Sequence, residues 1–228
     1  MKYFISNPEL DAQISEIRLK IRLSMNGIVS EQMTQKGILY KKNYGVSIPR
    51  IKEIASGYQP NHELAQRLWA LKIRETMIIA TLLQPIDSFS PELAHEWAET
   101  FNQIEIVEQL CMNIFSKLTF AAELCFNWIC SDNLWIQITG FSLAARVFEK
   151  IKKENMILIL EKAVDISPTE YFHLYKSIAV CLSRFCRKDK EIATYIHQEI
   201  NKFHPNESVG QQFILSEVEQ EILFSGIL

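Results

Sequence analysis

Glycine and proline are both scarce in this sequence. Each occurs seven times among 228 residues, whereas average usage would give roughly 16 glycines and 11 prolines. Because turns depend on these residues, the sequence favours a few long helices over many short strands. Neither a phosphate-binding loop nor a glycine-rich dinucleotide fingerprint is present, and so few glycines could not build them.

A basic excess is also missing. The net charge is −3 and the isoelectric point is near 6.0, whereas a dedicated nucleic-acid-binding protein usually has clearly more basic than acidic residues. Any surface that binds DNA must therefore be a local patch. The longest apolar stretch, residues 77–83, is too short to span a bilayer.

The cysteines and histidines form no recognisable site. The five cysteines are odd in number, contain no CxxC spacing and fall in apolar helical patterns, which predicts buried thiols in a reducing cytoplasm. The five histidines show no metal-ligand spacing, so we expect no metal site and no cofactor. No Ser/His/Asp or Cys/His arrangement is evident.

Helix starts are marked by capping residues and prolines. A polar residue that can accept a hydrogen bond from a helix amino terminus stands at or just before each one, often with proline close behind. The predicted starts are Asn7-Pro8, Ser47 with Pro49, Asn61, Ser90-Pro91 and a capping box at Ser167-Pro168-Thr169-Glu170.

Between these starts the apolar residues recur at helical spacing. One stripe is Leu134, Ile138, Phe141, Ala145 and Phe148, and a second is Tyr171, Leu174, Ile178, Leu182 and Phe185. The four tryptophans, Trp69, Trp97, Trp128 and Trp135, lie on such stripes and are expected in the core.

The segment 132–149 is apolar on more than one side, which is typical of a helix with neighbours both before and after it. We therefore predict an all-α fold, an α-α superhelix of HEAT-like antiparallel helix pairs with a concave face. A single domain over residues 1–228 is expected.

Four segments, in order, resemble the AlkD-like family of DNA alkylation-repair glycosylases. They are residues 43–50 (NYGVSIPR), Leu68-Trp69 followed by Arg74-Glu75, residues 104–111 (IEIVEQLC), and Trp128-Ile129 followed by Ser131-Asp132-Asn133-Leu134-Trp135. The resemblance implies a HEAT-like superhelix that holds duplex DNA on its concave face and excises alkylated purines. Active members of the family use a carboxylate and aromatic side chains beside the deoxyribose.

Several positions differ from the family pattern. The catalytic aspartate of the family falls on Glu108, and a cleft tryptophan falls on Ile104. A basic residue falls on Ile138, and the second cleft tryptophan falls on Val180. Isoleucine and valine have no aromatic face to attract a cationic sugar, so these departures from the family pattern predict weak or absent glycosylase activity here.

Glu108 has two interpretations. It is either the catalytic carboxylate that the family would use, or one acid on a solvated helix face. The loss of its aromatic partners favours the second interpretation. The segment 85–109 also holds six acidic residues and no lysine or arginine, which would repel phosphate.

Two basic clusters are candidates for contact with a DNA backbone. They contain Lys36, Lys41, Lys42 and Arg50 in the first cluster and Lys176, Arg184 and Arg187 in the second. Three hypotheses follow. The protein is an alkylpurine glycosylase, a DNA-binding relative without catalysis, or a helical scaffold for a protein partner. No membrane partner is expected.

Overall fold

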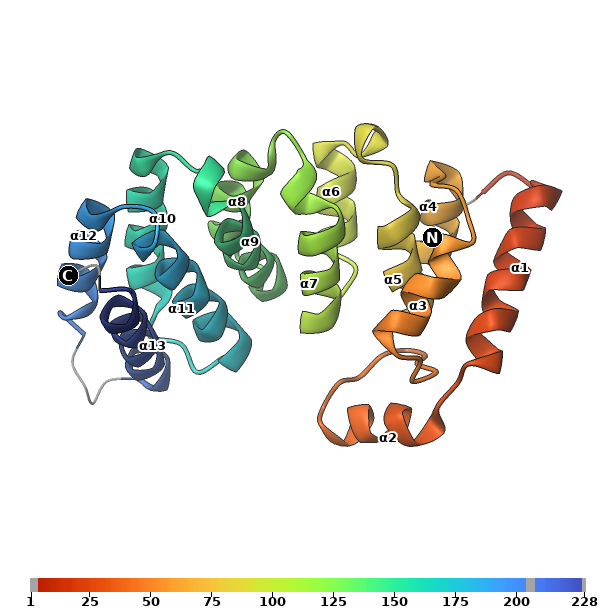
Figure 1. Ribbon diagram of the computed structural model, residues 1–228, viewed down its shortest axis with the longest axis horizontal. Coiled ribbons are helices and arrows are strands. Elements are labelled where there is room, and N and C mark those ends of the chain that lie inside the picture. Colours follow the sequence, from red (N-terminus) through yellow and green to blue (C-terminus); the bar gives the residue numbers. More distant parts are fainter. Residues whose placement is uncertain (1–3, 204–207, 227–228) are drawn as a thin grey trace. The chain divides into compact units, whose positions relative to one another are not determined.

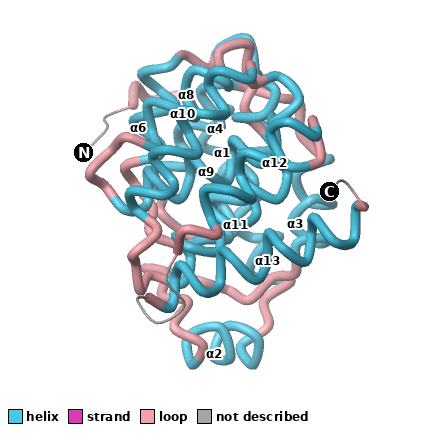
Figure 2. The backbone as a smooth tube through the Cα atoms, turned by 90° about the vertical axis from the view of Figure 1, so that its left-hand side faces the viewer, coloured by secondary structure: helices cyan, strands magenta, loops and turns pink. Residues whose placement is uncertain are grey.

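The computed structural model describes residues 4–203 and 208–226. Within them lie thirteen α-helices, three short 3-10 helices and no strand (Figures 1 and 2). Among the helices described, none is long and apolar enough to cross a membrane.

The chain divides into two compact units, residues 1–93 and 94–228, and the boundary falls inside α6. The first unit contains α1 (Pro8–Leu23), α2 (Gly27–Gln35), α3 (Ile48–Ser56), α4 (His62–Ala70), α5 (Arg74–Leu83) and η1 (Ile86–Ser88). After α6 (Pro91–Ala98), the second unit contains α7 (Ile104–Asn113), η2 (Phe115–Lys117), α8 (Ala121–Ile129), α9 (Leu134–Val147), η3 (Phe148–Lys150), α10 (Lys153–Ile166), α11 (Phe172–Cys186), α12 (Lys190–Ile200) and α13 (Val209–Ser225).

Four of the five predicted helix starts are confirmed. The side chain of Asn7 accepts a hydrogen bond from the Leu10 amide, and that of Asn61 accepts one from Leu64. Ser47 precedes α3 without a side-chain cap, and Ser90 Oγ accepts a hydrogen bond from the Leu93 amide (3.2 Å) at the start of α6.

The predicted capping box at 167–170 is wrong. Ser167 closes α10 instead, because its hydroxyl donates to the Val164 carbonyl (2.7 Å) three residues back in that helix. The next helix, α11, begins five residues later at Phe172. Thr169 Oγ1 accepts a hydrogen bond from the Tyr171 amide (3.2 Å) in the connection. A serine hydroxyl can therefore bond backward as readily as forward.

In the first unit a buried acid holds the loop before α3. The Glu75 side chain is fully buried, and its Oε1 accepts hydrogen bonds from the Tyr44 amide (3.0 Å) and the Val46 amide (3.3 Å). Gly45 between them has a φ of +69°, and a Cβ there would lie 2.1 Å from the Asn26 carbonyl oxygen. Only glycine fits at this position.

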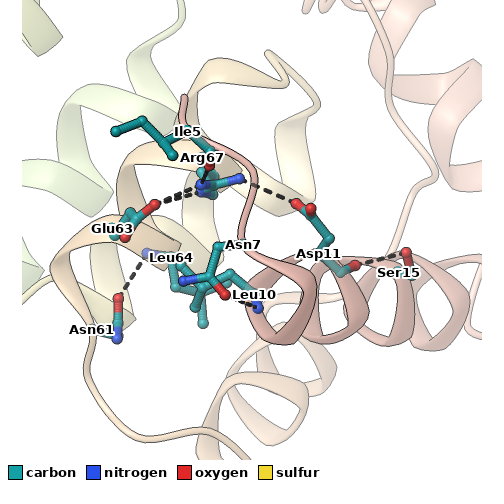
Figure 3. Close-up of polar contacts among 9 residues, drawn as sticks. All are labelled: Ile5, Asn7, Leu10, Asp11, Ser15, Asn61, Glu63, Leu64 and Arg67. Carbon is teal, nitrogen blue, oxygen red and sulfur yellow. Dashed lines mark hydrogen bonds and ion pairs between the residues drawn. The ribbon is translucent and has the colours of Figure 1, made fainter. Parts of the chain in front are cut away.

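Arg67 of α4 ties α1 and the preceding segment to the same unit (Figure 3). Its side chain is 8% exposed and contacts Asp11 (3.1 Å), Glu63 (2.5 Å) and the carbonyl of Ile5. The two carboxylates are about half exposed, at 54% and 47%. The guanidinium therefore replaces its lost water with protein oxygens, as a buried charge requires.

In the second unit α9 is the central helix, and it packs against α7, α8 and α11. Nine of its fourteen residues are buried, on more than one side, which explains the two-sided apolar pattern in the sequence. α11 in turn lies beside α13, as both views show (Figures 1 and 2).

The predicted burial of the tryptophans and cysteines is confirmed for most of these residues. Trp69, Trp97 and Trp128 are at most 5% exposed, whereas Trp135 is only half-buried. Four of the five cysteines are buried, but Cys130 is exposed because it follows the last residue of α8 as its C-cap. The apolar pattern in the sequence thus continues one residue beyond the buried part of α8.

Gly140 sets the crossing of α8 and α9. A Cβ at residue 140 would lie 2.8 Å from the Ile129 nitrogen and 3.1 Å from the Cys125 carbonyl oxygen. We expect Gly140→Ala to lower the free energy of unfolding by about 1–3 kcal/mol, because backbone must shift to admit the methyl group. Thermal and urea denaturation measure it. Gly27→Ala is the control, since nothing lies within 4 Å of its added Cβ, and equal effects at both sites would contradict the close crossing.

Arg67→Met keeps most of the apolar stem and removes the guanidinium. We expect a loss of about 1–3 kcal/mol in unfolding free energy, because three hydrogen-bond acceptors lose a charged donor. The matched control is Arg22→Met on α1, an exposed arginine, which should change stability by less than about 0.5 kcal/mol. Indistinguishable denaturation midpoints for the two variants would show that the Arg67 contacts add no stability.

Candidate functional site

A pocket of about 570 Å³ opens between α7, α9 and α11 in the second unit. We call it the α9 pocket. Its lining residues are Ile104, Glu108 and Met112 of α7, Ser116 of η2, Ser142, Ala145 and Arg146 of α9, Phe148 of η3, and Phe172, His173, Lys176, Ser177, Val180 and Arg184 of α11.

Helical spacing explains why these residues meet. On α7 the lining residues are four apart, at 104, 108 and 112, and on α11 they recur at 172, 176, 180 and 184. Residues four apart share one face of a helix. Between the two helices, α9 contributes the small side chains of Ser142 and Ala145, which leave the space open.

The pocket is basic although the chain is acidic. Three permanent cations line it, Arg146, Lys176 and Arg184, against one carboxylate, Glu108, which gives a local charge of 3 − 1 = +2. Of the six acids in the segment 85–109, only Glu108 lines the pocket. The acid-rich segment therefore does not make this pocket repel phosphate.

The three cations are available to a ligand. All three side chains are exposed, and none of them takes part in an ion pair within the part of the chain that the structure describes. Burial and the nearby Lys176 charge lower the pKa of His173, so this imidazole is neutral at pH 7.

Other predicted basic residues have partners. Both Arg187 Nε and Nη2 donate to the Glu221 carboxylate of α13, each at 2.6 Å, and this bidentate pair lies outside the pocket. In the first unit Arg50 pairs with Glu53 (2.6 Å) and donates to Ser24 Oγ (2.9 Å). These arginines hold helices together through charge-assisted bonds.

The remaining basic residues of the first cluster are exposed. Lys36 is the C-cap of α2, and Lys41 and Lys42 follow in the loop before α3. The ammonium of Lys42 lies over the ring of Tyr44, 5.0 Å from its centroid. α2 itself buries none of its residues, and both views show it set apart from the other helices of its unit (Figures 1 and 2).

The structure brings together most of the residues that the sequence assigns to a cleft. Ile104, Glu108 and Val180 all line the pocket, and Val180 is 41% exposed. Ile138 does not line the pocket. Its side chain is 1% exposed and packs in the hydrophobic core. The basic residue of α9 in the pocket is instead Arg146, eight residues further on.

Arg146 was missed by the sequence reasoning. Its signal is visible in retrospect, because it is the only charged residue in the fourteen residues of α9. A lone arginine on a helix that is buried on several sides needs an opening for its charge. Phe148 and Phe172 were missed as lining residues too, because Phe148 belongs to an apolar stripe and Phe172 directly follows Tyr171, the first residue of the other.

The buried cysteines offer no nucleophile. Burial raises the pKa of the Cys111 thiol to about 12 and that of Cys186 to about 12. It also raises the pKa of Cys125 and Cys181. Because the thiolate is the reactive form, these four side chains are inert at neutral pH.

The sequence matches the family described as DNA alkylation repair enzyme over residues 26–206. No curated protein matches it. The fold is similar to a solved structure from "a new family of proteins related to the HEAT-like repeat DNA glycosylases with affinity for branched DNA structures". The TM-score is 0.76 at 14% identity, over 94% of this chain and 95% of that chain.

This structural similarity confirms the predicted all-α fold of HEAT-like helix pairs. The match in sequence spans well over half of the chain and includes all four segments in which the resemblance was found. The chain belongs to the DNA alkylation repair enzyme family.

Proposed function

We propose that this protein binds DNA through the α9 pocket and has weak or no glycosylase activity. The observation that carries the proposal is the gathering of Arg146, Lys176 and Arg184 in one pocket of a net acidic chain. Cations that contact phosphates release condensed counterions from DNA, which favours binding. Family membership makes DNA the ligand to expect.

Duplex DNA is the first ligand that we propose, as the family implies. The similar solved protein is described as having affinity for branched DNA, so a three-way or four-way junction is the second. Lys36, Lys41 and Lys42 of the first unit are proposed as further backbone contacts, because they are exposed and unpaired with acids among the described residues. Arg50 and Arg187 contribute less, since each is held by a glutamate.

The proposed lack of strong catalysis follows from what surrounds Glu108. Excision of an alkylated purine develops positive charge on the sugar, which a carboxylate and aromatic faces stabilise. Glu108 supplies the carboxylate, but Ile104 one turn before it and Val180 on α11 supply no aromatic face. One exposed carboxylate at a solvated pocket gives little of the required stabilisation.

Phosphate contacts can be counted by salt dependence. We expect Lys176→Gln and Arg184→Gln each to weaken binding to a 20-base-pair duplex and to reduce the slope of log K against log salt by about 1. The control is Lys162→Gln on α10, a helix that contributes no residue to the pocket. Fluorescence anisotropy at several salt concentrations gives the slopes. Equal slopes for the unaltered protein and its three variants would contradict the proposed contacts. If the unaltered protein did not bind DNA at all, the proposal would fail and a protein partner would be the alternative.

Excision is tested with duplex DNA that carries 7-methylguanine. With protein in excess over DNA, we expect base release close to the rate without protein, because the aromatic stabilisation is missing. Glu108→Gln should leave that rate unchanged while DNA binding persists. Clear excision that Glu108→Gln abolishes would instead establish Glu108 as the catalytic carboxylate.

A further inference from the structure

Three aromatic rings form a row at one end of the α9 pocket. Phe172 and His173 open α11 and line the pocket, with ring centroids 5.4 Å apart. Trp135 of α9 continues the row, 5.9 Å from His173 at an interplanar angle of 39°. Phe172 is 48% exposed and the other two are half-buried. Part of each ring thus remains accessible to a ligand.

Two further aromatic side chains pack against Phe172 and hold its ring in place. Phe172 packs edge-on against Tyr175, with centroids 5.5 Å apart, and against Phe213 of α13, 6.4 Å away. Tyr175 is only 8% exposed and also contacts Phe213 at 5.1 Å. An aromatic ring held by two others loses little conformational freedom when a ligand stacks on it, which favours binding.

Cations continue from the rings along α11. The Lys176 ammonium lies over the Phe172 ring, 5.4 Å from its centroid. Phe172, Lys176 and Arg184 share the pocket face of α11, and from residue 172 to 184 that face is about 18 Å long at the rise of an α-helix. Arg146 of α9 also lines the pocket. The pocket face of α11 therefore presents an aromatic ring at its amino-terminal end and positive charges further along the helix.

We infer that the α9 pocket accepts an unpaired nucleotide of DNA, whose base stacks on the ring of Phe172 while Lys176 and Arg184 contact its phosphates. The His173 ring is inclined by 68° to that of Phe172, so it borders the stacked base and does not stack on it. The inference rests on the proposed function and names its ligand. A groove that combines aromatic faces with cations is the usual means of binding single-stranded nucleic acid. A base within a paired duplex is covered on both faces by its neighbours and has no face to offer.

The size and charge of the pocket agree with this ligand. Its volume of about 570 Å³ falls in the range of about 300–1,000 Å³ that small-molecule sites have. His173 is neutral at pH 7, since burial and Lys176 lower its pKa. Bulged and gapped DNA present unpaired nucleotides, whereas a perfect duplex presents none.

The test compares two DNAs of equal sequence, one fully paired and one with a single bulged 2-aminopurine. We expect the bulged DNA to bind about tenfold more tightly and its 2-aminopurine fluorescence to be quenched by stacking. Phe172→Ala should remove most of this preference, and Phe172→Leu, which keeps apolar bulk without a ring, should remove it too. Tyr171→Ala is the matched control, because Tyr171 is the neighbouring aromatic, 63% exposed, and does not line the pocket.

Trp135 provides a second readout in the unaltered protein. The other three tryptophans are buried, so a change of tryptophan fluorescence on binding reports on the ring row. Equal affinity for the two DNAs, or equal losses for Phe172→Ala and Tyr171→Ala, would overturn the inference. If the two DNAs bound equally well and the salt slope still depended on Lys176 and Arg184, the proposed DNA binding would hold and the inference about an unpaired nucleotide would fail. If neither DNA bound, both would fail.

Discussion

The packing of α9 between its neighbours is the constraint on which the rest of the second unit depends. This helix is covered on more than one side, and Gly140 lets α8 approach so closely that no Cβ fits between them. On another side, Ser142 and Ala145 are small enough to leave about 570 Å³ open between α7 and α11. Tight packing on one side of a helix and an opening on another thus come from the sizes of a few side chains, since close-packed interiors leave space only where side chains are small. The charge of Arg146 emerges into that opening.

The segments that resemble the glycosylase family divide by what they do in this structure. Gly45 and Glu75, from the first two segments, build the loop before α3, and Asn133, from the fourth, caps α9 by accepting hydrogen bonds from Trp135 and Ile136. These residues maintain the scaffold. The third segment and the Val180 position line the pocket, and there the side chains differ from the family pattern. A scaffold and the site it carries respond to different constraints, so the family can be recognised where its chemistry has changed.

The sequence predicted helices well where a single residue type decides their ends. Asparagine and proline at Asn7-Pro8 and Asn61 have few alternatives to a helix start. Ser167 has one, since its hydroxyl reaches back to close α10, and nothing in its neighbours distinguishes the two bonds. The pocket was predictable in part: Ile104, Glu108 and Val180 came from the family pattern, whereas Ile138 proved to be core and Arg146 took the place at the pocket. Which face of a two-sided helix opens to solvent depends on how α7 and α11 pack on it, and such tertiary contacts leave no periodic signal in the sequence.

Net charge was a poor guide to the pocket for a related reason. Exposed charges more than about 8–10 Å from a phosphate are largely screened at physiological salt, so an overall charge of −3 spread over the surface matters little at one site. Three cations on α9 and α11 act at close range, and the only carboxylate among the lining residues offsets one of them. Charge alone would attract any stretch of phosphate backbone. The aromatic row of Phe172, His173 and Trp135 adds discrimination, because stacking requires an exposed base face and distorted or unpaired DNA is where such faces occur. On α11, Lys176 and Arg184 therefore provide affinity for DNA, whereas Phe172 provides selectivity for an exposed base. The two properties can be separated by mutation.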